Sequence, residues 1–126
     1  MTVKSYRDLK VWQMAIDIVG EIYRLTENFP KQEGFGLTSH LQRAAVSIPS
    51  NIAEGHARGS DRELAHFLAI ARGSLAEVET QLIIAGRLTY LDHCGTVEPL
   101  LVRLDTLGKM MQGAEESSCQ PLATSR

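Results

Sequence analysis

The pattern that most constrains this chain is an unbroken helical repeat from Leu64 to Ala85. Its apolar residues alternate steps of four and three: Leu64, Leu68, Ala71, Leu75, Val78, Leu82 and Ala85. This spacing places all of them along one side of an α-helix, over about six turns. Ser60 and Glu63 precede the repeat with the spacing of a capping box. The sequence therefore predicts a long amphipathic helix that begins near Ser60.

A second long repeat lies near the N-terminus and contains two apolar rows. One row holds Leu9, Trp12, Ile16, Val19 and Tyr23, and the other holds Val11, Ala15, Ile18, Ile22 and Leu25. Two adjoining rows make the apolar face broader than a simple bundle requires. Either this helix is deeply buried between two neighbours, or one row packs in the core while the other contacts another subunit.

The segment from Leu41 to Gly59 predicts a helix interrupted by a proline. Its apolar residues again recur at steps of three and four: Leu41, Ala44, Ala45, Ile48 and Ile52. Pro49 cannot donate to the carbonyl of Ala45 and its ring presses on that carbonyl, at a cost of about 3 kcal/mol. We therefore expect a kink at Pro49. The helix should end at Gly55 or Gly59, where a positive φ costs little.

Four amphipathic helices joined by short links favour an all-α fold, an antiparallel up-down-up-down four-helix bundle. The last helix would contain Val97, Leu100, Leu101, Leu104, Leu107 and Met111. Aromatic residues make up only 6% of the chain, so the core must be built from aliphatic side chains. We expect residues 1–112 to form the bundle. Residues 113–126 lack periodicity and should form a flexible C-terminal tail.

Charge and cysteine usage limit the classes of function. A net charge of −2 argues against a surface that attracts phosphate everywhere, so any nucleic-acid site would be local. The two cysteines lack metal-binding spacing, which indicates reduced thiols. No apolar signal core opens the chain, and no run of about 18 apolar residues could span a bilayer. These features predict a cytoplasmic protein with no membrane partner, metal or cofactor.

The chain offers few residues arranged for catalysis. Glu63 and His66 have the E-x-x-H spacing of di-iron carboxylate proteins, but that design needs a second such pair and two more inward-facing glutamates. In the simpler interpretation, Glu63 caps its helix and His66 is an ordinary helix residue. A metal-dependent carboxylate enzyme using Glu63, His66 and Glu77 is therefore the alternative hypothesis, and a non-enzymatic protein is the leading one.

Basic residues cluster loosely around and after the corner between the second and third helices. They are Arg58, Arg62, Arg72 and Arg87. The simplest interpretation is a solvated helix face. The alternative is a local basic surface that contacts phosphate. For Asn51 and Glu54, which lie on the polar stripe of the second helix, we favour a structural role inside the bundle.

Two segments carry a resemblance to a known family. AAVSIPSNIAEGHAR at 44–58 and FLAIARGSLAEVETQL at 67–82 closely resemble four-helix-bundle proteins named for open reading frames in intervening sequences of bacterial 23S ribosomal RNA genes. The resemblance extends over residues 6–91. The most specific part is the I-P-x-N-I-A-E-G motif, matched at Ile48, Pro49, Asn51, Ile52, Ala53, Glu54 and Gly55. The resemblance implies structural roles for these residues.

The resemblance implies a bundle that forms a ring of five subunits. It also implies kinship with the accessory variability determinant of diversity-generating retroelements, which binds nucleic acid and partners a reverse transcriptase. In a ring, the second apolar row of the first helix would lie at the subunit contact, so we expect Val11, Ile18 and Ile22 there.

These observations lead to a non-enzymatic, homopentameric scaffold that binds RNA or DNA. We expect the phosphate contacts to come from four arginines: Arg58, Arg62, Arg72 and Arg87. A scaffold that binds only a protein partner, without nucleic acid, is the alternative within the same class.

Overall fold

The computed structural model describes residues 5–91 and 97–119, and these residues form a four-helix bundle. The long helices are α1 (Lys10–Thr26), α2 (Leu37–Ala57), α3 (Asp61–Arg87) and α4 (Val97–Cys119). Short 3₁₀ helices, η1 (Tyr6–Asp8) and η2 (Lys31–Glu33), precede α1 and α2. No strand occurs among the described residues. The predicted all-α, four-helix fold is confirmed.

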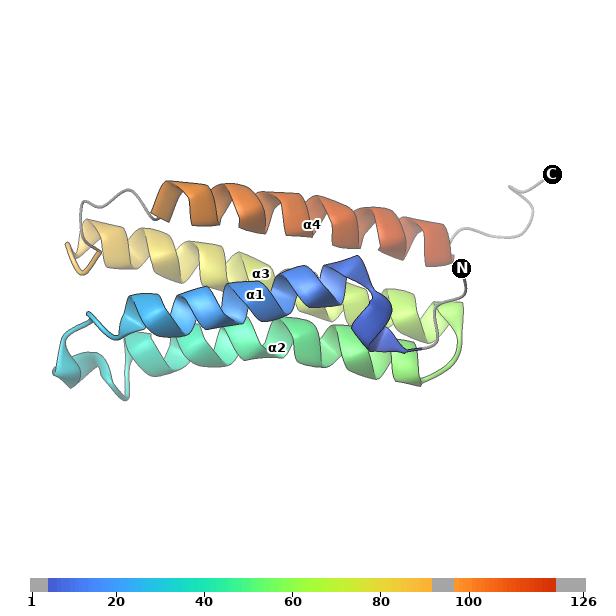
Figure 1. Cartoon of the computed structure of the whole chain (residues 1–126), viewed down its shortest axis with the longest axis horizontal. Helices are drawn as coiled ribbons and strands as arrows, with labels where there is room; N and C mark the ends of the chain where they lie inside the picture. Colours follow the sequence, from blue (N-terminus) through green and yellow to red (C-terminus); the bar gives the residue numbers. More distant parts are fainter. Residues whose placement is uncertain (1–4, 92–96, 120–126) are drawn as a thin grey trace.

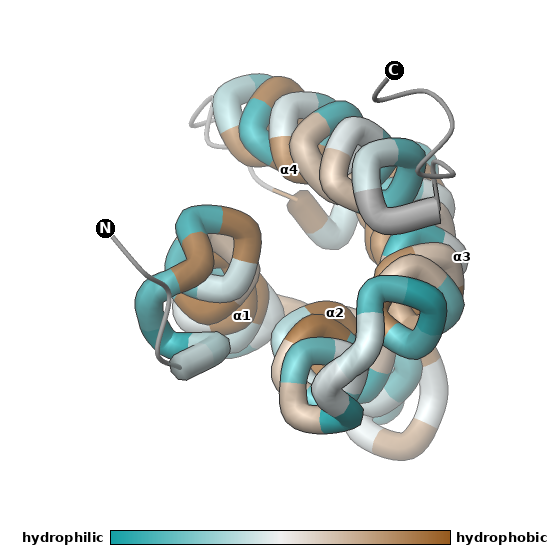
Figure 2. The backbone as a smooth tube through the Cα atoms, turned by 90° about the vertical axis from the view of Figure 1, so that its right-hand side faces the viewer, coloured by the Kyte–Doolittle hydropathy of each residue, from teal (hydrophilic) through white to brown (hydrophobic). Residues whose placement is uncertain are grey.

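The four helices lie lengthwise against one another, with the sequence colours running in opposite directions along consecutive helices (Figure 1). Seen from one end, they surround a common interior (Figure 2). The α2–α3 contact is the most extensive and the α1–α4 contact the least. An ion pair between Glu21 and Arg103 joins α1 to α4.

The core is aliphatic and takes side chains from all four helices. Its largest fully buried members are Ile18, Ile22, Leu41, Ile48, Ile52, Leu68, Val78, Leu82, Leu104, Leu107 and Met111. Full burial of one such side chain stabilises the fold by about 1.5–3 kcal/mol. The unbroken repeat of α3 supplies Leu68, Val78 and Leu82, so the side predicted to be apolar is the side that packs in the core.

The corner between α2 and α3 explains two glycines of the predicted helix end. Gly59 has φ of 86°, in the left-handed region that glycine tolerates, and it lies just beyond the end of α2. Ser60 then caps α3, since its Oγ accepts the N–H of Glu63 at 3.1 Å. Gly55 lies inside α2 and allows close approach to α3: a Cβ there would be 2.7 Å from the Cβ of Phe67.

Pro49 lies inside α2, which continues as one helix from Leu37 to Ala57. Its side chain is buried on the side that faces α1. The kink expected at this residue stays a prediction.

The predicted boundary between bundle and tail at residue 113 is wrong, because α4 continues to Cys119. The extension is held in place by tertiary contacts that sequence periodicity does not show. Met111 is fully buried, Ala114 packs against the core, and Glu115 accepts a hydrogen bond from Arg72 of α3. Residues 120–126 of the predicted tail lie outside the described residues.

None of the described helices combines the length and the hydropathy that a membrane span needs.

Candidate functional site

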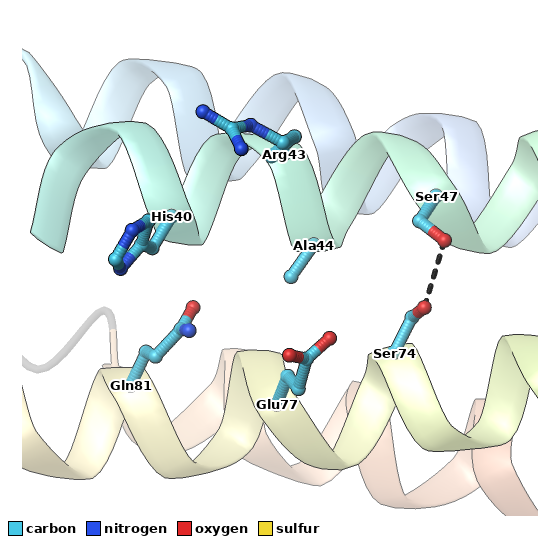
Figure 3. Close-up of a pocket in the computed structure, with 7 residues that line it drawn as sticks. All are labelled: His40, Arg43, Ala44, Ser47, Ser74, Glu77 and Gln81. Carbon is cyan, nitrogen blue, oxygen red and sulfur yellow. Dashed lines mark hydrogen bonds between the residues drawn. The ribbon is translucent and has the colours of Figure 1, made fainter. Parts of the chain in front are cut away.

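A polar groove runs between α2 and α3, and we call it the α2–α3 groove. It encloses about 340 Å³ and is lined by His40, Arg43, Ala44 and Ser47 of α2 and by Ser74, Glu77 and Gln81 of α3 (Figure 3). These residues recur every three or four positions on each helix, so each helix presents one polar strip to the groove.

A hydroxyl pair closes one end of the groove. Ser47 Oγ and Ser74 Oγ are 2.7 Å apart, and Ser74 is only 8% exposed. Asn51 Nδ2 donates to both the carbonyl oxygen and the Oγ of Ser47, at 2.8 and 2.9 Å. A buried hydroxyl without a partner would cost about 1–3 kcal/mol. The Ser47–Ser74 hydrogen bond gives the hydroxyl of each helix a partner. Asn51 thus joins the hydroxyl pair to the backbone of α2 one turn earlier.

The other end of the groove carries further hydrogen-bond acceptors, one of them buried without a partner in the described structure. The Oε1 atom of Gln81 is buried and has no hydrogen-bond partner within the described structure. Glu77 is exposed, and its carboxylate extends toward Ala44 (Figure 3). His40 points toward α3, whereas the guanidinium of Arg43 points away from it (Figure 3) and donates to Ser39 at 3.2 Å. This end can accept hydrogen bonds from a donor group.

The four predicted phosphate-binding arginines do not form one surface. Arg58 donates to Glu54 at 2.8 Å and lies 5.0 Å from the centre of the Phe67 ring. Arg72 donates to Glu115 at 2.7 Å. In each case the hydrogen bond to the carboxylate is the main cause that raises the pKa of the arginine.

Arg62 and Arg87 are exposed and have no ion pair with any described residue. They lie near opposite ends of α3, separated along the helix axis by about 37 Å at 1.5 Å per residue. A single chain therefore does not bring the free arginines together.

The motif residues of α2 divide by the side of the helix on which they lie. Ile48, Pro49, Ile52 and Gly55 are buried, and Ala53 is partly buried beside α1. Glu54 is exposed and pairs with Arg58 one turn later. The pairing of Glu54 stays on the surface of α2 and does not reach the bundle interior.

The assignment of Ile18 and Ile22 to a subunit contact is wrong. Both side chains are 0% exposed in the core of the single chain, so they have no surface to offer to another copy. Val11, the third residue of that set, is partly buried and packs against the core. The row that reaches the surface is the other one, with Ile16 41% and Tyr23 44% exposed. Both rows are apolar, and the position of the neighbouring helices decides which one faces inward.

The proposed carboxylate metal site is also wrong in its geometry. Glu63 lies at the capped start of α3, and His66 packs edge-on against the Phe67 ring with 5.1 Å between ring centres. Glu77 is about 21 Å further along the helix than Glu63, at 1.5 Å per residue. One ion cannot contact all three, and no group of three potential metal ligands occurs in the described part of the chain.

A second groove lies along α3 and α4, and we call it the α3–α4 groove. It encloses about 330 Å³, and its lining includes Arg72, Glu79, Asp105 and Lys109. Burial, with a smaller contribution from Asp105, raises the pKa of Glu79. Lys109 lies 3.3 Å from Asp105 and offsets part of that negative charge. The charges in this groove are thus largely compensated within the chain.

The sequence reasoning missed an apolar groove between α1 and α2, which we call the α1–α2 groove. It encloses about 270 Å³ and is lined by Tyr6, Trp12, Ile16, Val19, Val46, Pro49, Ser50 and Ala53. None of these residues carries a charge. The signal in the sequence was the apolar row of α1 that holds Trp12, Ile16 and Val19; the row expected at a subunit contact was that of Val11, Ile18 and Ile22.

The reasoning also missed Phe35, which lies in the link between η2 and α2. Its side chain is 100% exposed. The signal was an aromatic residue between two glycines, Gly34 and Gly36, in an otherwise polar link. A large apolar side chain with no contact in its own chain is a candidate for binding something else.

The link that carries Phe35 is fastened to the α3–α4 end of the bundle. Tyr90 Oη donates to Glu33 Oε2 at 2.7 Å, and Glu33 Oε1 accepts the N–H of Leu37 at 3.1 Å. The Tyr90 ring also packs against Phe29, with 5.7 Å between centres. The hydrogen bond from Tyr90 lowers the pKa of Glu33, and the same bond raises the pKa of Tyr90.

Comparison with known proteins gives one family. The family model described as 23S rRNA-intervening sequence protein matches residues 7–113. A search of curated proteins finds no match to this chain.

Proposed function

The chain belongs to the 23S rRNA-intervening sequence protein family, and on that premise we propose that it is a non-enzymatic scaffold that assembles from several copies of itself. The observation that carries the proposal is the amount of large apolar surface left exposed after the bundle has formed. A monomeric protein usually scatters such side chains singly, whereas contiguous apolar patches mark sites of association.

Four such side chains lie on α3. Ile70, Ile83, Ile84 and Leu88 are each about half exposed, with Ile84 at 42% and Leu88 at 48%. By helical periodicity, Ile70, Ile84 and Leu88 share the outward face of the helix, and Ile83 lies to one side of it. Gly73 lies on the same outward face, and a Cβ at that position would meet nothing within 4 Å among the described residues. No side chain projects from Gly73, so another helix could approach the backbone of α3 closely at this position.

Burial of these four side chains alone would not hold copies together. Burying the exposed half of four such side chains contributes ~4 kcal/mol, at about 1.5–3 kcal/mol for each full side chain. Association costs about 4–15 kcal/mol in lost freedom of motion. A stable assembly therefore needs additional contact area, which the α1–α2 groove and Phe35 could supply.

The number of copies is tested by mass. The resemblance implies five copies, and five chains of 13.9 kDa give ~70 kDa. Size-exclusion chromatography with multi-angle light scattering at micromolar concentration should show one species well above the monomer mass. A strictly monomeric protein across that range removes the proposal.

Nucleic acid is the partner that we propose for the assembly. In one chain, Arg62 and Arg87 are far apart, but rotation-related copies would repeat each of them around a common axis and create a ring of cations. Binding through such a ring should weaken linearly in log affinity against log salt. Affinity for single- and double-stranded RNA and DNA can be measured by fluorescence anisotropy across ionic strengths.

The ion pairs decide which arginines should be replaced to test this binding. Arg62→Gln and Arg87→Gln should reduce both the affinity and the salt slope, whereas Arg58→Gln should reduce them less, because Glu54 already compensates Arg58. Assembly without any salt-dependent binding would leave a scaffold for a protein partner and would reject nucleic acid.

A further inference from the structure

Phe35 is exposed and its backbone is held in place. The N–H of Gly34 donates to Lys31 O at 3.0 Å, and the N–H of Gly36 donates to Glu33 O at 2.9 Å. Glu33 is itself bound by Tyr90 and Leu37. A side chain presented on a fixed turn loses little conformational entropy when it binds, which is the property of an interface anchor.

Of the four grooves described, one is suited to a phenyl ring. The α2–α3 groove is lined in part by Arg43 and Glu77, and the α3–α4 groove carries both acids and bases. The groove on the outward face of α3 includes Glu77. The α1–α2 groove has no charged lining residue, so a phenyl ring that enters it removes no charge from water.

Phe35 cannot fill the α1–α2 groove of its own chain. Pro49, in the floor of that groove, is twelve residues along α2 from Leu37, a distance of about 18 Å. The link between η2 and α2, which carries Phe35, lies at the end of the bundle where the chain passes from α1 to α2, at the left in Figure 1. Only another molecule can bring a Phe35 ring to the groove.

We propose that Phe35 of one copy docks in the α1–α2 groove of the next copy, against Trp12, Ile16 and Val46. This inference rests on the proposed self-association and assigns its contact. In this arrangement each copy uses its Phe35 on one neighbour and its groove on another, which is a heterologous contact. Repetition of such a contact produces a ring when the rotation closes.

The area of the contact is consistent with a second copy as the occupant. A fully buried Phe removes about 150–250 Å² from water. A stable interface needs about 800 Å² from each partner. One residue thus supplies a fifth to a third of one side of the interface, and the partly exposed Ile16 and Val46 add apolar area on the groove side.

The test uses two variants that damage opposite halves of the contact. Phe35→Ala removes the anchor and keeps the groove, whereas Ile16→Arg blocks the groove and keeps the anchor. Both sites are exposed, so the fold should persist, and circular dichroism and the melting temperature of each variant check this. Val102→Ala, at a 63% exposed site on α4, is the matched control.

Light scattering should show each variant alone as a monomer and the control assembled like the wild type. An equimolar mixture of Phe35→Ala and Ile16→Arg should form dimers of twice the monomer mass and nothing larger, because each pair retains one intact contact. That recovery requires Phe35 of one copy to meet the α1–α2 groove of another, and a wild-type mass above that of a dimer identifies the contact as heterologous.

Three results would overturn the inference. Assembly of Phe35→Ala like the wild type rejects the anchor and leaves self-association intact. Monomers in the mixture reject the pairing of Phe35 with the α1–α2 groove. A monomeric wild type rejects the inference and the proposed function together.

Discussion

Replacing Gly55 by alanine should destabilise the bundle, although alanine favours a helix more than glycine does. The new Cβ would be 2.7 Å from the Cβ of Phe67 and 3.3 Å from the Cα of Leu64. Both atoms are fixed by the path of α3, so relief requires the two helices to separate. Overpacking of this kind costs about 1–3 kcal/mol.

The gain from helix propensity is about 1 kcal/mol and opposes that cost. Since the contact at Gly55 is with backbone as well as side chain, we take the upper half of the overpacking range. The net change is then a loss of ~1–2 kcal/mol in the free energy of unfolding.

Gly86→Ala is the matched control on α3. Its Cβ would meet only Leu91 Cδ1, at 3.9 Å, an ordinary contact. The higher helix propensity of alanine should therefore dominate, and the free energy of unfolding should rise by ~0.5–1 kcal/mol. The two substitutions are chemically identical, but the structure gives them opposite signs.

Urea unfolding followed by circular dichroism measures both effects as shifts of the midpoint at constant m. The titrations need equal protein concentration, and repetition at a second concentration, because assembly makes apparent stability depend on concentration. If Gly55→Ala raises the midpoint as Gly86→Ala does, the close approach of α2 and α3 does not limit residue 55, and the reasoning fails.

Three further outcomes follow from polar contacts. Ser74→Ala should cost ~1 kcal/mol in urea unfolding, and adding Ser47→Ala should cost little more, because the double variant leaves no member of the hydroxyl pair unmatched; additive losses would contradict this. The pKa of Glu33 is lowered, so its bond to Tyr90 stabilises the fold above the usual pKa of a glutamate and is lost as the pH falls through the lowered value. Tyr90→Phe should remove that acid dependence of the melting temperature, and an unchanged profile would reject the assignment. Glu115→Gln should increase amide hydrogen exchange in the last turns of α4 only; a global increase would place the ion pair in the cooperative core.

The sequence was sufficient for the elements whose periodicity had one solution. In α3, a single apolar row was present, and Leu68, Val78 and Leu82 of that row are fully buried. The capping box at Ser60 also fixed the start of the helix correctly, because the cap is a local contact between residues three apart.

The sequence was not sufficient where the outcome depended on a distant neighbour. Two apolar rows on α1 gave no reason to choose Ile16 over Ile18 as the exposed residue, since helix position alone decides which row is covered. The end of α4 was missed because Arg72, far away in the sequence, holds Glu115. Phe35 was passed over because polar links are expected to be simple connections, and only its complete exposure marks it as a contact residue.

The unequal packing of the four helices has a consequence for the order in which the chain folds. The α2–α3 pair has the most extensive contact, its partners are adjacent in sequence, and a three-residue link, Arg58 to Ser60, connects them. Loop closure for this hairpin costs little entropy, so we expect it to form in the transition state, with α1 and α4 docking afterwards on its two flanks. Mutations at the hydroxyl pair should therefore slow refolding, whereas mutations at the Glu21–Arg103 pair should mainly speed unfolding.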